Sequence, residues 1–260
     1  YIGCQAPDEV DIFQEAIETA TNADEVLLIV GTNSDWETEG NDRADFNLPA
    51  NQNKLIDAIL EANPNTVLVI NTGSPVNMPW VSKAKAIVQT WFAGQEFGNA
   101  LVDILSGKVN PSGKLPTTFP ANIEDTPAYK HYPGNDLQMN YDEKLFVGHR
   151  WYETNSIKPL FCFGHGLSFT NFNYQNLEVT IDDNLAVSCK FEVQNIGDIP
   201  GLETAQCYVG YSDPMPQQPC KTLQGFVKEE IGANELKKME INLGPRNFSY
   251  WSVDRGAWEI

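Results

Sequence analysis

Residues 26–60 read VLLIVGTNSDWETEGNDRADFNLPANQNKLIDAIL and pass from an apolar run through a polar loop into an amphipathic helix. The run VLLIVG has no polar interruption, which is typical of a strand buried on both faces of a parallel sheet. The helix carries apolar residues at Leu55, Ile56, Ile59 and Leu60. A strand, a loop and a covering helix predict an α/β fold, in which ligands collect at the carboxyl ends of the strands.

The same alternation continues on both sides of this stretch. Apolar spacing predicts helices over 11–23 and 95–107, and apolar runs predict strands over 66–73 and 86–92. From residue 177 the period changes to two, and short strands are expected over 177–181, 185–193, 203–211, 223–231 and 237–243. We therefore predict a mainly parallel α/β sandwich domain over 1–120, a connector wrapping the domains over 121–174, and an antiparallel all-β sandwich over 175–260.

Charge and composition narrow the classes of partner. The formal net charge is −18, and no cluster of Lys and Arg occurs that could bind phosphates, so a nucleic-acid partner is not expected. The same charge opposes an anionic membrane surface, and no apolar run approaches the roughly 20 residues that span a bilayer. A neutral ligand such as a sugar meets no electrostatic penalty.

Cofactor and metal signatures are missing from the sequence. It contains neither GxGxxG after a strand nor GxxxxGK[ST], and its five cysteines form no CxxC pair. We expect no cofactor and no metal site. Cys189 and Cys207 fall in alternating strands and are interpreted as small core residues. The three histidines, His131, His149 and His165, are far apart and are interpreted as loop or packing residues.

The loop after the first apolar run is crowded with carboxylates, at Asp35, Glu37, Glu39, Asp42 and Asp45. Acidic residues on a surface loop are more often solvated than catalytic. Trp36 lies among them, however, and a ring beside carboxylates suits a sugar, whose face stacks on the ring. Arg43 could stiffen the loop by pairing with Asp42 or Asp45. The loop is thus a candidate sugar-binding or glycosidase loop.

Several motifs extend this interpretation to a family. They occur in the order WETEGNDRADFNLPANQ, NTGSPVNMPW, QTWFAGQEFGNALVDILSGKVNPSGKLPTTFP, YDEKLFVGHRWYE, FCFGHGLSFT and FSYWSVDRGAW. In this order they resemble segments of glycoside hydrolase family 3 β-glucosidases, and the resemblance covers essentially the whole chain. It implies the second half of an α/β sandwich domain followed by a fibronectin type III-like (immunoglobulin-like) sandwich. We therefore expect the sequence to be part of a longer chain.

The resemblance also implies a mechanism. Family members are retaining exo-β-glucosidases in which two carboxyl groups act about 5–5.5 Å apart. The glutamate of the EG(Y)DR segment is the acid/base, so this role falls on Glu39, with Trp36, Asp42 and Arg43 expected to bind substrate. The nucleophile is an aspartate of an N-terminal barrel domain, a partner that this sequence lacks. Asp35 also stands in an SDW triplet, but it lies in the wrong domain and is interpreted as unrelated.

Some questions stay open at this point. The chain departs from the family pattern at Asn41, His149, His165 and Cys162, which bears on packing or substrate preference.

Another exo-β-glycosidase, such as a β-xylosidase or a β-N-acetylglucosaminidase, and a non-catalytic carbohydrate-binding module are the alternatives. A homo-oligomer is possible. The compartment is left open with secretion favoured, and the sequon at Asn247 matters only in a secreted protein.

Overall fold

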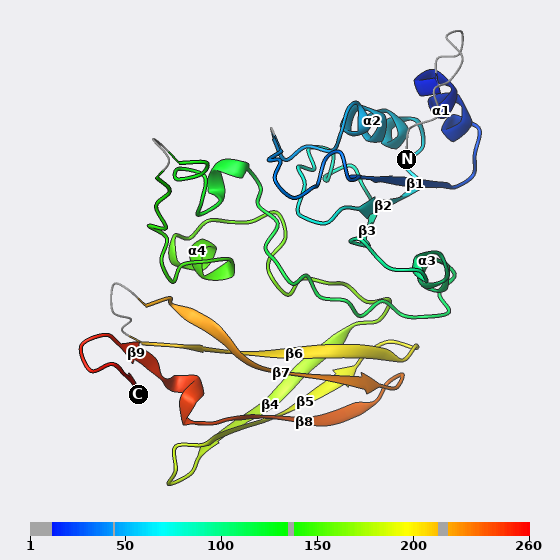
Figure 1. The fold of residues 1–260 in the computed structure, drawn as a ribbon. Helices are drawn as coiled ribbons and strands as arrows, with labels where there is room; N and C mark the ends of the chain where they lie inside the picture. The colour runs from blue at the N-terminus through cyan, green and yellow to red at the C-terminus, as the bar shows by residue number, and fades with distance from the viewer. Residues whose placement is uncertain (1–11, 44, 135–137, 213–217) are drawn as a thin grey trace. The chain divides into compact units, whose positions relative to one another are not determined.

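The computed structural model describes residues 12–43, 45–134, 138–212 and 218–260. The chain divides into two compact units, Tyr1–Phe97 and Gly98–Ile260, whose elements are labelled in Figure 1. The expected α/β and all-β architectures are both found.

The first unit is built on a parallel sheet of three strands in the order β1-β2-β3. The strands are β1 (Val26–Gly31), β2 (Thr66–Asn71) and β3 (Ala86–Gln89), and the helices are α1 (Ile12–Thr21) and α2 (Gln52–Ala62). The alternation of strand and helix confirms the predicted parallel α/β fold. In β2, Leu68, Val69 and Ile70 are completely buried, so the central strand forms the core of this unit.

The expected burial of β1 on both faces is wrong. Leu27 is 49% exposed and Ile29 is 51% exposed, whereas Val30 is buried. Among the described residues β1 is an edge strand that pairs with β2 alone. An apolar run identifies a strand, but only the neighbouring elements decide whether both of its faces are covered.

The second unit begins with short helices in a largely irregular segment. These are α3 (Phe97–Leu105), whose first residue belongs to the first unit, η1 (Ile123–Asp125) and α4 (His149–Thr154). An antiparallel sandwich follows. One sheet contains β4 (Phe172–Ile181), β5 (Val187–Asn195) and β8 (Leu236–Leu243), and the other contains β6 (Gly201–Gly210) and β7 (Lys221–Ile231). After η2 (Pro245–Phe248), a hairpin pairs β9 (Tyr250–Ser252) with β10 (Ala257–Glu259).

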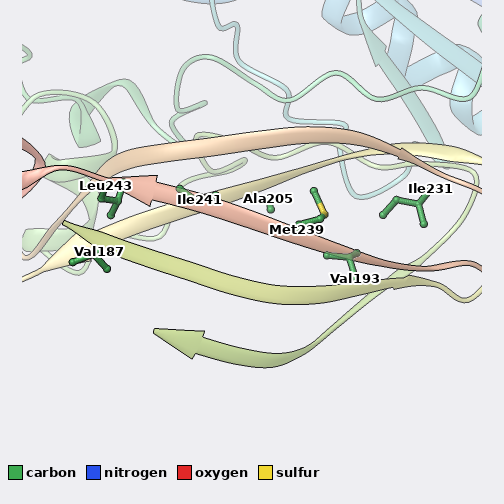
Figure 2. Packing of buried hydrophobic residues seen from close by; sticks show 7 residues of the cluster. All are labelled: Val187, Val193, Ala205, Ile231, Met239, Ile241 and Leu243. Carbon is green, nitrogen blue, oxygen red and sulfur yellow. The ribbon is translucent and has the colours of Figure 1, made fainter. Parts of the chain in front are cut away.

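The two sheets of the sandwich enclose one hydrophobic cluster. Figure 2 shows its buried members, which come from both sheets: Val187, Val193, Ala205, Ile231, Met239, Ile241 and Leu243. Cys189 and Cys207 are half-buried and pack against this cluster, as expected of small core residues. Burial and a hydrogen bond with the Cys189 thiol raise the pKa of the Cys207 thiol. Cys4 lies outside the described residues.

Two histidines of this unit pack on aromatic rings. The His149 ring stacks on Phe163 with centroids 4.9 Å apart, and the His165 ring stacks on Phe161 at 5.1 Å. Burial lowers the pKa of both imidazoles. Nearby positive charge adds to this effect, mainly from Arg150 at His149 and from Lys114 at His165, while Glu153 opposes it at His149. These are packing histidines, as the sequence predicted.

The lowered pKa of the partly buried His149 predicts that acid destabilises the protein. The pKa of His149 in the folded chain lies below the ordinary value of 6.5, so the unfolded chain takes up protons first as the pH falls. The stability contributed by the neutral imidazole is present above that value and lost below it. Urea unfolding at about pH 8 and about pH 5.5 should show a smaller loss in His149→Phe than in the unsubstituted protein. Equal losses would contradict the assignment.

Candidate active site

The candidate site lies in the first unit, in the loop that leaves the carboxyl end of β1. Asn33 starts a tight turn: its carbonyl accepts the N–H groups of Trp36 at 3.0 Å and Glu37 at 2.9 Å, and its Oδ1 accepts the N–H of Asp35 at 3.1 Å. The turn reverses the chain immediately beyond the strand. The acidic residues are therefore held at the edge where parallel sheets bind ligands.

Glu39 lies at the tip of a second turn. Thr38 and Asn41 form an antiparallel bridge, which leaves Glu39 and Gly40 as the two central residues. Gly40 has φ +82°, the conformation that a type II turn requires at its third residue. The Glu39 side chain is exposed and makes no hydrogen bond or ion pair with any described residue. Its carboxyl group is consequently free to meet a ligand.

The glycine after Glu39 should be sensitive to substitution. A Cβ at Gly40 would meet no atom within 4 Å, so Gly40→Ala is strained by its backbone alone. We expect a cost of about 1 kcal/mol in the native turn. Chemical denaturation would measure this cost, and activity assays of the full-length protein would report the displaced carboxyl group. Gly94→Ala is the matched control, because Gly94 has open space and no positive φ; comparable losses in both variants would contradict the role of the turn.

The carboxylate of Glu37, two residues before the tip of the turn, accepts three hydrogen bonds. Its Oε2 accepts the N–H of Gly73 at 2.9 Å, and its Oε1 accepts the Ser74 hydroxyl at 2.9 Å and Nη1 of Arg43 at 3.3 Å. The side chain is 14% exposed. Arg43 therefore pairs with Glu37, and the expected pairing with Asp42 or Asp45 is wrong. The pattern of charges could not distinguish the partners, because the turns bring Glu37 and not its neighbours to the guanidinium.

The far end of the loop is fastened to the sheet and to α2. The Gln52 amide donates to the Gly31 carbonyl and accepts the Gly31 N–H, both at 2.9 Å, which ties the start of α2 to the end of β1. Oδ1 of Asn47 accepts hydrogen bonds from the amides of Asn53 and Asn77. Nε1 of Trp80, whose side chain is almost completely buried, donates to Asn53 Oδ1 at 2.9 Å. The end of the acidic loop is thus hydrogen-bonded to α2 and to the segment between β2 and β3, and the start of α2 is hydrogen-bonded to the end of β1.

These turns enclose a shallow hollow of about 390 Å³. Its lining residues are Trp36, Glu37, Thr38, Glu39, Asn41, Asp42, Arg43 and Ser74. All four residues proposed from the sequence, Trp36, Glu39, Asp42 and Arg43, therefore line one surface. Nε1 of Trp36 is buried without a hydrogen-bond partner among the described residues. The hollow combines a free carboxyl group, an indole and a guanidinium.

In the sequence Glu37 is one of five acids in the loop, and Ser74 lies outside the motif that predicts the site. Ser74 belongs to the segment NTGSP, which follows β2. Because β1 and β2 are parallel neighbours, the loops that follow them leave the same edge of the sheet. The parallel pairing of these two strands could therefore have indicated that Ser74 lies near the acidic loop.

Comparison with known proteins identifies the family. The family model of the glycosyl hydrolase family 3 C-terminal domain matches residues 5–169, and that of the fibronectin type III-like domain matches residues 203–260. The chain belongs to glycosyl hydrolase family 3. This result confirms the resemblance of the sequence motifs and the predicted order of the two architectures.

Relatives within family 3 cover nearly the whole chain. It is 41% identical over 256 residues to probable beta-glucosidase I of Emericella nidulans, matching 95% of this chain and 30% of that protein. It is 39% identical to thermostable beta-glucosidase B of Acetivibrio thermocellus, covering 96% of this chain and 34% of that protein. The crystal structure of a beta-glucosidase from Kluyveromyces marxianus in complex with glucose superposes with a TM-score of 0.92 at 38% identity, over 97% of this chain and 31% of that one. The family 3 chain spans about a third of the length of these relatives.

Two features are absent from the described residues of this family 3 chain, 12–43, 45–134, 138–212 and 218–260: a metal-binding cluster and a membrane-spanning helix. No group of three or more His, Cys, Asp or Glu side chains in these ranges could hold a metal ion. No helix within them has the length and apolar character needed to cross a membrane.

Proposed function

We propose that this chain is the carboxyl-terminal part of a retaining, exo-acting β-glucosidase in which Glu39 is the general acid/base. One observation carries the proposal: Glu39 stands free at the tip of a tight turn whose next residue, Gly40, has a positive φ, on the rim of a hollow shared with Trp36 and Arg43. The motif that contains it occurs in a chain of family 3, and the relatives named above are β-glucosidases.

In the proposed reaction Glu39 acts twice. It first gives its proton to the glycosidic oxygen while a carboxylate nucleophile attacks the anomeric carbon, so that the carbon–oxygen bond breaks and a glycosyl-enzyme ester forms. Glu39, now ionised, then takes a proton from a water molecule whose oxygen attacks the anomeric carbon. The ester bond breaks, the nucleophile is released as a carboxylate, and the configuration at the anomeric carbon is retained.

The other residues of the hollow are proposed to bind the sugar. The Trp36 ring offers an apolar face to the pyranose, and Asp42 and Arg43 offer an acceptor and donors to its hydroxyl groups. The Arg43 guanidinium already pairs with Glu37. Its N–H groups are therefore held in place when they donate to the sugar hydroxyl groups.

The nucleophile is proposed to come from an upstream partner. An N-terminal barrel domain of the same protein would place an aspartate about 5–5.5 Å from the Glu39 carboxyl group, the separation that retaining glycosidases use. The α/β domain over 1–120, the connector over 121–174 and the β-sandwich over 175–260 would then follow this barrel. We expect the isolated chain to have no hydrolase activity.

A panel of nitrophenyl glycosides tests the substrate class on the full-length protein. We expect the β-D-glucoside to be cleaved with the highest kcat/KM, and NMR of the first product formed should show the β-anomer. Faster cleavage of a xyloside or an N-acetylglucosaminide would favour another exo-β-glycosidase. If no glycoside is cleaved while the isolated chain binds glucose, the chain is a non-catalytic carbohydrate-binding module.

A further inference from the structure

The partly buried carboxylate of Glu37, beside the candidate acid/base, has a role of its own. Glu37 lies two residues before Glu39, at the base of the turn that presents it. Both of its oxygens are occupied by protein donors, from Gly73, Ser74 and Arg43. A carboxylate engaged in this way is held in one orientation by the protein, although it lines the hollow. Its contacts join two separate loops.

We propose that Glu37 is a positioning residue for the acid/base: it fastens the turn that bears Glu39 to the loop that follows β2. This inference rests on the proposed function of Glu39. Hydrogen bonds that involve a charged group are about twice as strong as neutral ones, so the two from Gly73 and Ser74 form an effective anchor, while the third, from Arg43, ties Glu37 to its own loop. Among the described residues, no other hydrogen bond joins residues 34–43 to the loop after β2.

The loop that receives Glu37 is itself fixed to the sheet. Within it the Thr72 hydroxyl donates to the Ser74 carbonyl at 2.9 Å. The amide of Gln89, at the end of β3, donates to the Thr72 carbonyl at 3.3 Å and to the Thr72 hydroxyl at 3.2 Å. A chain of hydrogen bonds thus runs from the end of β3 through the loop after β2 to Glu37. The position of Glu39 is set by the sheet rather than by its own loop alone.

Gly73 shows how closely the two loops approach. A Cβ added at this position would collide with Oε2 of Glu37 and would lie 2.8 Å from Cε2 of Phe92. Gly73 has no positive φ, so glycine is required here by space and not by backbone conformation. Gly73→Ala should therefore displace Glu37 without removing any charge, which provides a second way to break the same anchor.

The leaving group of the substrate supplies the test. Positioning of an acid matters most when the departing alcohol is basic and needs a proton, and least when it departs unaided. In the full-length protein we expect Glu37→Ala to lower kcat/KM for an alkyl β-glucoside by about 10²-fold, the usual result of misplacing a catalytic group by about 1 Å. For dinitrophenyl β-glucoside the loss should be smaller than about fivefold. Gly73→Ala should show the same dependence on leaving group.

Asp35→Asn is the matched control. Asp35 lies in the same loop and carries the same charge, but its carboxylate has no hydrogen bond to a described residue and it does not line the hollow. We expect its kcat/KM to stay within about twofold for both substrates, as is usual for surface changes. Glu37→Gln, which keeps an acceptor oxygen, should fall between Glu37→Ala and the unsubstituted protein.

The outcomes separate this inference from the function on which it rests. Equal losses on both substrates in Glu37→Ala and Gly73→Ala would indicate a general structural defect and overturn the positioning role. Azide should restore activity to Glu39→Gly and not to Glu37→Gly; rescue of Glu37→Gly would make Glu37 the acid/base. If Glu39→Gln shows no dependence on the leaving group, the proposed function itself fails. If only Glu39→Gln shows this dependence, the role of Glu37 alone is wrong.

Discussion

Glu39→Gln in the full-length protein is expected to lower kcat/KM for alkyl β-glucosides by about 10²- to 10⁴-fold, the range that general acid catalysis contributes. Glutamine has nearly the same shape as glutamate but no proton to give to the glycosidic oxygen. Because Glu39 is exposed and makes no hydrogen bond or ion pair with a described residue, the substitution should leave the melting temperature unchanged. Loss of activity without loss of stability identifies a chemical role.

Two further measurements complete this prediction. The loss should shrink for dinitrophenyl β-glucoside, since its leaving group departs without a proton. In Glu39→Gly a small anion such as azide can enter the vacated space and attack the glycosyl-enzyme, so turnover should partly return and a β-glycosyl azide should form. If Glu39→Gln keeps most of its activity on alkyl glucosides, Glu39 is not the acid/base.

The largest effect on stability is expected at Asn195, at the end of β5. This side chain is completely buried. Its amide donates to the carbonyls of Ile199 at 2.8 Å and Ile231 at 3.1 Å, and its Oδ1 accepts the Gly197 N–H at 3.0 Å and the Thr170 hydroxyl. Asn195→Ala leaves the buried Ile231 carbonyl and Thr170 hydroxyl without this partner, together with the less buried Gly197 N–H and Ile199 carbonyl. Each such group costs about 1–3 kcal/mol, so we expect the free energy of unfolding to fall by about 3 kcal/mol or more.

Asn184→Ala is the control for this prediction. Asn184 is exposed in the turn between β4 and β5. Its N–H donates to Asp182 Oδ1, a bond that survives in alanine, and its side chain has no hydrogen bond to a residue that the structure describes. Its effect in urea unfolding should stay within about 0.5 kcal/mol. A loss below about 1 kcal/mol in Asn195→Ala would show that water replaces the amide.

Local patterns predicted the longer helices and the main strands of both units, but not α4 or the short helices η1 and η2. The apolar runs at 26–31 and 66–71 form β1 and β2, and the helical spacing around Ile56 and Ile59 forms α2. Alternation also located the strands of the sandwich. It did not predict exposure: Leu177, Val179 and Ile181 of β4 are more than half exposed, because β4 lies at the edge of its sheet among the described residues. Periodicity describes a chain segment, whereas burial depends on what covers it.

The candidate site also has a part that the sequence predicted, and other features of the chain depended on folding. The acidic loop, Trp36 and Arg43 could be located from the sequence, since they directly follow a strand of a parallel sheet. Asn195 illustrates the opposite case: the sequence around it indicates a turn, but its complete burial and its bonds to Ile199 and Ile231 depend on segments that meet only after folding.

By itself the sequence determined the α/β and all-β architectures, the family motifs and the position of Glu39 after β1. Only the tertiary structure decided that Glu37 is the residue bound by Arg43, Gly73 and Ser74, while Glu39 stands free. The physical reason is distance. Hydrophobic periods and turn residues act between neighbours in sequence, but Glu37 and Ser74 are brought together by the parallel pairing of β1 with β2. Which of two similar carboxylates is anchored is therefore a property of the fold.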